Sequence, residues 1–206
     1  EIDYFIHKEH ISGNKTIDQA QLLAFGEILS SAIFHQLLAN AIKEEILLVD
    51  ARSFMVSGAH GSSYVESKIN IIPTRENIKC LFSITENKYR IFLTQGFVST
   101  DDESGRCAVL GYDGSDLSAA IIALSLQETG ETQLTYWKDV LGVLKDLKYP
   151  DIFPVMKINE YLEYSILSSV PVRPDSLRVL QDMNSSFRVY IRSFLKLESL
   201  GTIIKP

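Results

Sequence analysis

Two stretches of the sequence decide the fold: residues 94–97 (TQGF) and residues 110–120 (LGYDGSDLSAA). The first stretch follows residues 90–93 (RIFL), whose apolar and β-favouring side chains predict a strand that ends at the glycine. The second stretch is a glycine-rich turn followed by a run of good helix formers. Together they predict a strand, a loop and the start of a helix, which is the arrangement that many α/β proteins use to hold a ligand.

The turn itself carries several features of an anion site. Gly111 and Gly114 allow positive φ angles and a close approach of backbone to ligand. Ser115 and Asp116 are residues that favour helix caps. A helix that begins there presents unpaired N–H groups and a partial positive charge to phosphate or carboxylate. The alternative is a capped junction that binds nothing, because two glycines three residues apart are a weak signal.

Hydrophobic periodicity along the chain alternates between the helical and the strand type. Helices are expected at residues 17–41, 115–127, 158–165 and 174–183, and strands at residues 45–49, 89–93, 134–137 and 187–191. This alternation predicts an α/β protein with a mainly parallel sheet that helices cover on both faces. Gly26 interrupts the first helix at a cost of about 1 kcal/mol relative to Ala, so we expect a neighbour to pack closely on it.

The composition narrows the class of protein. The 206 residues are enough for one domain, and we assign residues 1–206 to a single domain. A net charge of −6 argues against nucleic acid as a partner. Two isolated cysteines and four scattered histidines form no disulfide framework and no metal-binding spacing, which favours the cytoplasm. We expect no membrane contact, because no apolar run approaches the ~20 residues of a span.

Five segments, in order, resemble the aspartate kinases of the amino acid kinase superfamily. The resemblance covers residues 17–206 and rests on residues 25–30 (FGEILS), 49–52 (VDAR), the TQGF and LGYDGSD stretches, 137–143 (WKDVLGV) and 192–204, which ends in GTII. It implies a three-layer α/β/α sandwich with the amino acid kinase (carbamate kinase-like) fold.

The family domain opens with a strand and a K-F-G-G motif, which this sequence does not contain. We therefore expect a domain that lacks the first strand of the family and carries no ACT regulatory domain. Removal of a central strand exposes unpaired backbone groups at a sheet edge. Residues 1–6 could cover that edge, or the chain forms a homo-oligomer.

The resemblance also implies a reaction, in which ATP with Mg²⁺ phosphorylates the β-carboxylate of L-aspartate on the way to lysine, threonine and methionine. Glu27 would accept the α-ammonium group of aspartate, and Arg52 would bind its α-carboxylate with two hydrogen bonds. A structural ion pair is the alternative for Glu27, and a solvated charge at a strand end is the alternative for Arg52.

The nucleotide side follows from the same resemblance. Gly111, Gly114 and Ser115 would lie against the phosphates, and Asp116 would be catalytic by ordering donors or a water bound to Mg²⁺. Further nucleotide contacts are expected from Lys138, Asp139 and Lys148. The alternatives are a plain N-cap for Asp116 and a solvated side chain for Lys138. We expect the turn, Glu27 and Arg52 to face one cleft.

Some residues depart from the family pattern on the phosphate side. Tyr112 stands where the family has an arginine, and Asp113 adds a negative charge. Pro171 forces a different backbone in the segment that corresponds to the family's F-G-A-x-V-[LI]-H-P pattern. The catalytic lysine of the K-F-G-G region has no counterpart. We therefore expect little turnover and a stronger recognition of aspartate than of nucleotide. The second hypothesis is a degenerate kinase domain that serves as a binding or assembly module.

Overall fold

The computed structural model describes residues 15–58, 63–146 and 149–206. The chain divides into two compact units, Glu1–Ser115 (unit 1) and Asp116–Pro206 (unit 2). The boundary falls within the first turn of helix α4 (Gly114–Leu126). Residues 1–6, which were expected to cover a sheet edge, lie outside the described ranges, as does Lys148.

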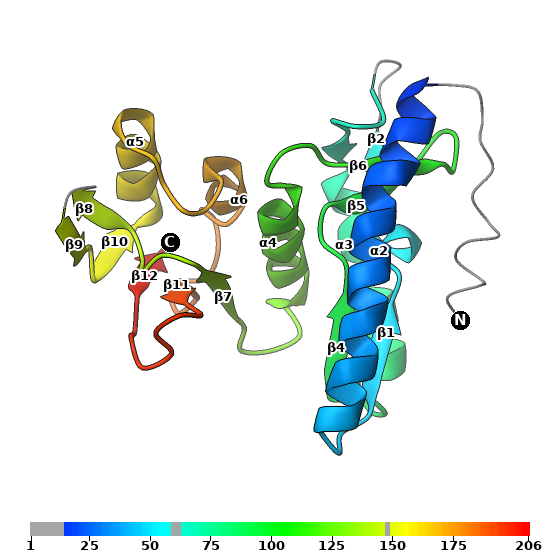
Figure 1. The fold of residues 1–206 in the computed structure, drawn as a ribbon, viewed down its shortest axis with the longest axis horizontal. Helices are drawn as coiled ribbons and strands as arrows, with labels where there is room; N and C mark the ends of the chain where they lie inside the picture. Colours follow the sequence, from blue (N-terminus) through cyan, green and yellow to red (C-terminus); the bar gives the residue numbers. More distant parts are fainter. Residues whose placement is uncertain (1–14, 59–62, 147–148) are drawn as a thin grey trace. The chain divides into compact units, whose positions relative to one another are not determined.

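Unit 1 combines one long helix with two small sheets (Figure 1). Its elements are α2 (Lys15–Ala41), β1 (Ile46–Val49), the short 3-10 helix η1 (Ala51–Ser53), β2 (Val56–Gly58), β3 (Lys68–Ile69), α3 (Ile71–Thr85), β4 (Ile91–Thr94), β5 (Val98–Asp101) and β6 (Cys107–Val109). Strands β1 and β4 pair in parallel, and the second sheet has the order β3-β2-β5-β6. Helix α2 packs against β1, β4 and β6.

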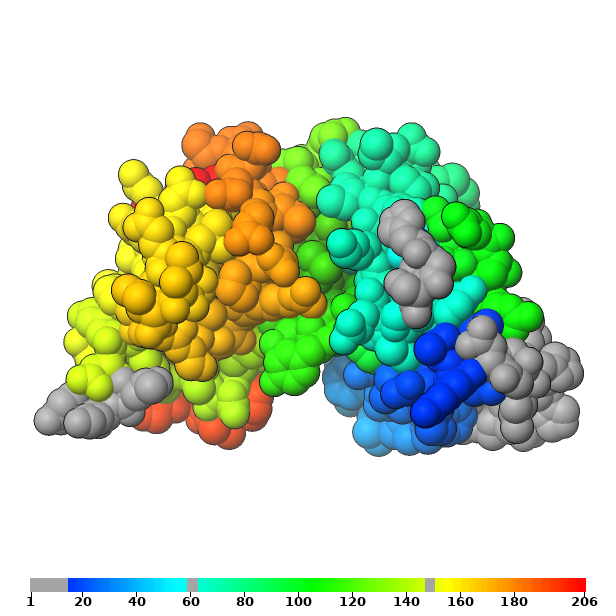
Figure 2. All heavy atoms as spheres, turned by 90° about the horizontal axis from the view of Figure 1, so that it is seen from above, coloured from blue at the N-terminus to red at the C-terminus, as the bar shows by residue number. Residues whose placement is uncertain are grey.

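One face of α2 belongs to the core of unit 1 and the other faces solvent. Its buried residues recur at helical spacing and are Ile17, Ala20, Ala24, Ile28 and Ser31. The exposed apolar residues are Leu22, Leu23, Phe25, Ile33, Phe34 and Leu37. Figure 2 shows atoms of this helix, in blue, at the surface. A Cβ added at Gly26 would meet nothing within 4 Å, so the expectation of a closely packed neighbour is wrong for the described residues.

The expectation that no apolar run approaches the length of a membrane span is wrong for helix α2. Within the described ranges it is one helix that is long and apolar enough to cross a membrane, with a mean hydropathy of 1.5 over 18 residues. Length and composition alone give that result. Of that 18-residue window 11% is buried, and the buried stripe of the helix packs on β1, β4 and β6.

Unit 2 has a four-stranded sheet with the order β10-β12-β11-β7 and a separate hairpin of β8 and β9. Its elements after α4 are β7 (Gln133–Lys138), β8 (Leu144–Asp146), β9 (Tyr149–Ile152), β10 (Val155–Lys157), α5 (Ile158–Leu167), α6 (Pro174–Arg178), β11 (Arg188–Ser193) and β12 (Thr202–Lys205). Alternate side chains of the strands enter the core of unit 2, among them Leu134, Tyr136, Val189, Ile191 and Ile204. The helices contribute Ala120, Tyr161 and Leu177, among others.

The strand pairing agrees with an α/β protein. The pairs β1–β4, β2–β5, β7–β11 and β10–β12 are parallel, and each joins strands separated by other elements. The antiparallel pairs join strands that follow one another along the chain. Parallel pairs require such crossover connections, whereas neighbours in sequence can form hairpins. The sheets are therefore mixed, with the helix and strand alternation that the sequence predicts.

One predicted helix is shorter than expected. The periodicity over residues 174–183 predicts a helix, but α6 ends at Arg178. The N–H group of Val179 bonds to the carbonyl oxygens of Asp175 and Leu177, and the chain continues as turns. Leu180 and Met183 are buried, so their spacing reflects turns anchored in the core of unit 2.

Candidate functional site

The two stretches that decide the fold interlock in unit 1. A Cβ added at Gly96 would lie 2.8 Å from the Cα atom of Ser115. A Cβ added at Gly114 would lie 2.8 Å from Cβ of Leu110 and 3.1 Å from Cδ2 of Phe97. The N–H group of Leu110 also donates to the carbonyl oxygen of Phe97 at 2.9 Å. Glycine is favoured at both turns because an added Cβ atom would lie within 3 Å of neighbouring atoms.

The start of α4 differs in detail from the prediction. Gly111 has a φ of +75°, as predicted, but the second positive φ of the turn belongs to Asp113, at +55°. Gly114 serves the close approach to Phe97 and not a positive φ. Helix α4 begins at Gly114, so Ser115 and Asp116 lie in its first turn and do not cap it. An acidic residue in that turn still complements the helix dipole.

Asp116 is the centre of a polar cluster in unit 2. Its two carboxylate oxygens accept hydrogen bonds from Nζ of Lys138 at 2.8 and 2.9 Å, and Oδ2 also accepts from the N–H group of Arg173 at 3.3 Å. Asp116 is only 8% exposed. The plain N-cap for Asp116 and the solvated side chain for Lys138 are therefore both wrong. The W-K-D segment and the G-S-D turn, distant in sequence, meet at this ion pair.

Tyr136 extends the same cluster toward the core. Its hydroxyl donates to the backbone carbonyl oxygen of Asp116 at 2.9 Å. Burial raises the pKa of Tyr136 well above its ordinary value, and the negative charge of Asp116 adds to that effect. The phenol therefore stays protonated and keeps the carbonyl end of the Asp116 residue in place.

Two other candidates in unit 2, Asp139 and Asp146, are exposed. Asp139 follows Lys138 and its side chain is exposed. Asp146 ends β8 and is also exposed, whereas Lys148 lies outside the described residues. The segment around Pro171 departs from the family pattern, yet its backbone reaches Asp116 through the N–H group of Arg173.

Arg52 is fixed in unit 1 by its neighbour Asp50. Nε of Arg52 donates to Oδ1 of Asp50 at 3.0 Å, and Nη2 donates to Oδ2 at 2.8 Å. Asp50 also accepts from the backbone N–H of Arg52 and so caps η1. The Arg52 side chain is 20% exposed. A solvated charge at the strand end is therefore wrong, and the guanidinium has a defined orientation.

Glu27 lies half-buried on α2. Among the residues that the structure describes, its carboxylate makes no hydrogen bond and no ion pair, so the structural ion pair is not found there. This half-buried carboxylate is a candidate acceptor for a cationic ligand group. That Glu27 and Arg52 bind one ligand stays a prediction.

The sequence analysis missed the role of Gln95. This residue of the TQGF stretch is 4% exposed. Its Nε2 donates to Oγ of Ser31 at 2.7 Å, and its Oε1 accepts from the N–H group of Ala51 at 2.8 Å. It therefore joins α2 to the start of η1. A polar residue inside the TQGF motif was the available signal, but sequence spacing does not show which backbone group it meets.

The side chains of the described residues form no preformed metal site. The described residues contain no group of three or more His, Cys, Asp or Glu that could hold a metal ion. Mg²⁺ in kinases is held by one or two carboxylates together with the phosphates of the nucleotide. Such a site does not need a preformed cage of side chains.

Comparison with known sequences finds a family model and related proteins that match most of this chain. The amino acid kinase family matches residues 5–193. The chain is 25% identical over 192 residues to the bifunctional aspartokinase/homoserine dehydrogenase of Buchnera aphidicola, covering 90% of this chain and 22% of that protein. It is 26% identical over 187 residues to chloroplastic aspartokinase 1 of Arabidopsis thaliana, covering 89% and 32%. The chain thus spans less than a third of the length of these relatives.

Solved structures share the fold. The chain resembles E. coli aspartokinase III in complex with aspartate and ADP, with a TM-score of 0.81, 20% identity and coverage of 92% of this chain and 41% of that one. Giardia carbamate kinase has a TM-score of 0.55 with 13% identity, covering 92% and 73%. These likenesses confirm the predicted three-layer α/β/α fold.

Proposed function

The chain belongs to the amino acid kinase family. From that premise we propose that it catalyses the aspartate kinase reaction. In this reaction the β-carboxylate of L-aspartate takes the γ-phosphoryl group of ATP, which yields 4-phospho-L-aspartate and ADP. The relatives named above support the resemblance drawn from the five motifs, since they are aspartokinases. The proposal also holds that residues 1–206 form a single domain of this kind. It places the protein in the cytoplasm.

The observation that carries the proposal is the ion pair between Asp116 and Lys138 at the first turn of α4. Phosphoryl transfer depends on positioning and on neutralising charge, and a lysine fixed by a carboxylate supplies a positive charge of defined position. In the proposal, Lys138 and Asp139 contact the nucleotide, as does Lys148. The turn formed by Gly111, Gly114 and Ser115 would lie against its phosphates, although the N–H group of Gly114 already donates to the carbonyl oxygen of Gly111 at 3.1 Å.

Mg²⁺ would neutralise charge on the phosphates and arrive bound to ATP. Asp116 would contact Mg²⁺ only through a bound water, because Lys138 already donates hydrogen bonds to both carboxylate oxygens of Asp116. The task of Asp116 in the proposal is to hold Lys138 in place.

Glu27 and Arg52 recognise aspartate in the proposal. Arg52 offers a planar donor group whose orientation Asp50 fixes, which suits the α-carboxylate. Glu27 offers a half-buried acceptor to the α-ammonium group. Aspartate binding is expected to be stronger than ATP binding, because Asp113 adds a negative charge beside the phosphate turn.

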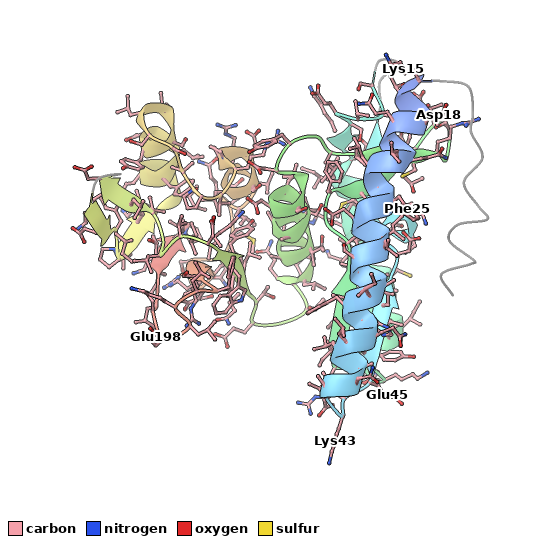
Figure 3. All side chains as sticks on the ribbon, viewed as in Figure 1. Lys15, Asp18, Phe25, Lys43, Glu45 and Glu198 are labelled. Atoms are coloured by element: carbon pink, nitrogen blue, oxygen red, sulfur yellow. The ribbon has the colours of Figure 1, made fainter. Side chains whose placement is uncertain are left out.

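Self-association is also proposed. The exposed apolar residues of α2, described above, form a surface that a second copy of the chain could cover. Figure 3 marks Lys15 and Phe25 on this helix and Lys43 just beyond its C-terminal end. No charged side chain lies on α2 between Glu27 and Ala41, so half of the helix is free of charge repulsion.

Calorimetric titration and a coupled ADP-release assay test the proposed function. Aspartate should bind and Arg52→Ala should weaken that binding, whereas glutamate should bind poorly because it is one methylene longer. ADP release should depend on aspartate and stay well below the ~10 per second typical of enzymes. Absence of both aspartate binding and aspartate-dependent ADP release would overturn the kinase proposal and favour the binding-module hypothesis.

A further inference from the structure

We propose that Gln95 is a positioning residue for substrate recognition, because it holds the helix that carries Glu27 against the turn that carries Arg52. The inference rests on the proposed function for the roles of Glu27 and Arg52. Its structural part, which concerns the order of the Arg52 turn, is independent of any ligand.

The contacts of Gln95 use both ends of its amide. Nε2 donates to Oγ of Ser31 on α2, and Oε1 accepts from the N–H group of Ala51 at the start of η1. Ser31 in turn donates to the carbonyl oxygen of Ile28. Gln95 is 4% exposed, so water competes little for these bonds.

The register of the parallel pair β1–β4 explains how Gln95 reaches both partners. Val49 pairs with Thr94, so Gln95 leaves β4 at the level where the chain leaves β1 toward Ala51. The carboxyl ends of parallel strands meet at one edge, which is where ligands bind in open α/β sheets. Helix α2 packs on both strands and brings Ser31 to the same edge.

Each partner of Gln95 adjoins a proposed substrate residue. Ser31 lies four residues after Glu27, so the two side chains share one face of α2. Ala51 directly precedes Arg52, whose guanidinium Asp50 orients. Gln95 therefore sets the spacing between the segments that bear an acceptor for the ammonium group and a donor for the carboxylate. Aspartate carries these two groups on one carbon, so their receptors must keep a narrow spacing, and a displacement of about 1 Å can cost ~100-fold in activity.

The test is the substitution Gln95→Met in the full chain, which keeps the approximate length of the side chain and removes both hydrogen bonds. We expect the Kd for aspartate to rise by ~10-fold or more, in line with the loss of a positioned contact. The Kd for Mg·ATP should stay within about twofold, because the hydrogen-bond partners of Gln95, Ser31 and Ala51, are not proposed nucleotide residues. The matched control is Ser57→Ala, which breaks the buried hydrogen bond between Ser57 and Ser99 in the same unit. It should change neither affinity.

Amide hydrogen exchange of Arg52 provides the second readout. In Gln95→Met this amide should exchange at least tenfold faster, while the amides of β5 and β6 keep their wild-type rates. An equal loss of both affinities, an equal loss in Ser57→Ala, or unchanged aspartate binding would overturn the inference. If the wild-type chain binds no aspartate, the proposed function fails instead. In that case the positioning of the Arg52 turn is supported by faster exchange at Arg52 and overturned by unchanged exchange.

Discussion

The Nζ atom of Lys138 lies 2.8 Å from Oδ1 and 2.9 Å from Oδ2 of Asp116, so one lysine bridges both oxygens of the carboxylate. The pair is mostly buried, with 24% and 11% of the side chains exposed. Charge-assisted hydrogen bonds in such surroundings are stronger than those between neutral groups. The ion pair therefore gives Lys138 a fixed position at the end of β7.

Replacement of this lysine should separate nucleotide binding from aspartate binding. In Lys138→Met the Kd for Mg·ATP should rise by ~10-fold to 100-fold, which corresponds to the loss of one charge-assisted bond. The Kd for aspartate should change by less than about twofold. Calorimetric titration of both ligands checks this. Lys145→Met is the control, since Lys145 forms an exposed pair with Asp151 and should affect neither ligand.

Two glycines should respond to alanine with opposite signs. Gly114→Ala places a Cβ 2.8 Å from Cβ of Leu110, and this overpacking should lower the free energy of unfolding by about 1–3 kcal/mol. Gly26→Ala meets open space within α2 and should raise the free energy of unfolding by up to about 1 kcal/mol. Urea denaturation measures both values. A stabilised Gly114→Ala protein would contradict the close approach of Leu110 and Phe97 to this glycine.

The sequence predicted the long elements well because their patterns are strong. The helix over residues 17–41 matches α2, and the strand over residues 134–137 matches β7 within one residue. Helix α3 (Ile71–Thr85) was not predicted, because a proline near its start and mixed polarity hide its periodicity. The short strands β2 and β3 were missed for a related reason, since two or three residues carry no alternation.

The candidate site was predictable where a motif supplies the residue and not where the fold supplies the contact. The motifs named Asp116, Lys138 and Arg52. They did not show that Asp116 binds Lys138 or that Asp50 binds Arg52, because such pairs depend on which strand ends come together. The same limit applies to Gln95, whose partners lie 64 and 44 residues away in sequence.

Tyr136 should make the protein sensitive to alkaline pH. Its pKa is raised in the folded state by burial and then by Asp116, so the unfolded chain loses this proton first, near pH ~10. The stabilising effect is complete below that pH and is lost as pH rises toward the folded pKa. The free energy of unfolding should fall by about 1.4 kcal/mol per pH unit from this group.

Urea denaturation between pH 8 and 11 measures the effect. Tyr136→Phe should lose about 0.5–1.5 kcal/mol at pH 8 from the missing hydrogen bond to Asp116, and should then show a shallower decline above pH ~10. Tyr112→Phe is the control, because this residue is 89% exposed and its variant should follow the wild-type curve. Parallel curves for Tyr136→Phe and the wild type would contradict the assignment.

The exposed face of α2 should control self-association. Ile33, Phe34 and Leu37 are 49%, 52% and 61% exposed on one stretch of this helix, and a second copy would remove them from water. Light scattering should find the wild-type chain larger than a monomer. Phe34→Glu with Leu37→Glu should give a monomer, because the charges oppose burial on association. Ile84→Glu is the matched control, as Ile84 is 73% exposed on α3 and its variant should keep the wild-type mass. A monomeric wild type, or an unchanged mass in the double variant, would show that this face does not mediate association.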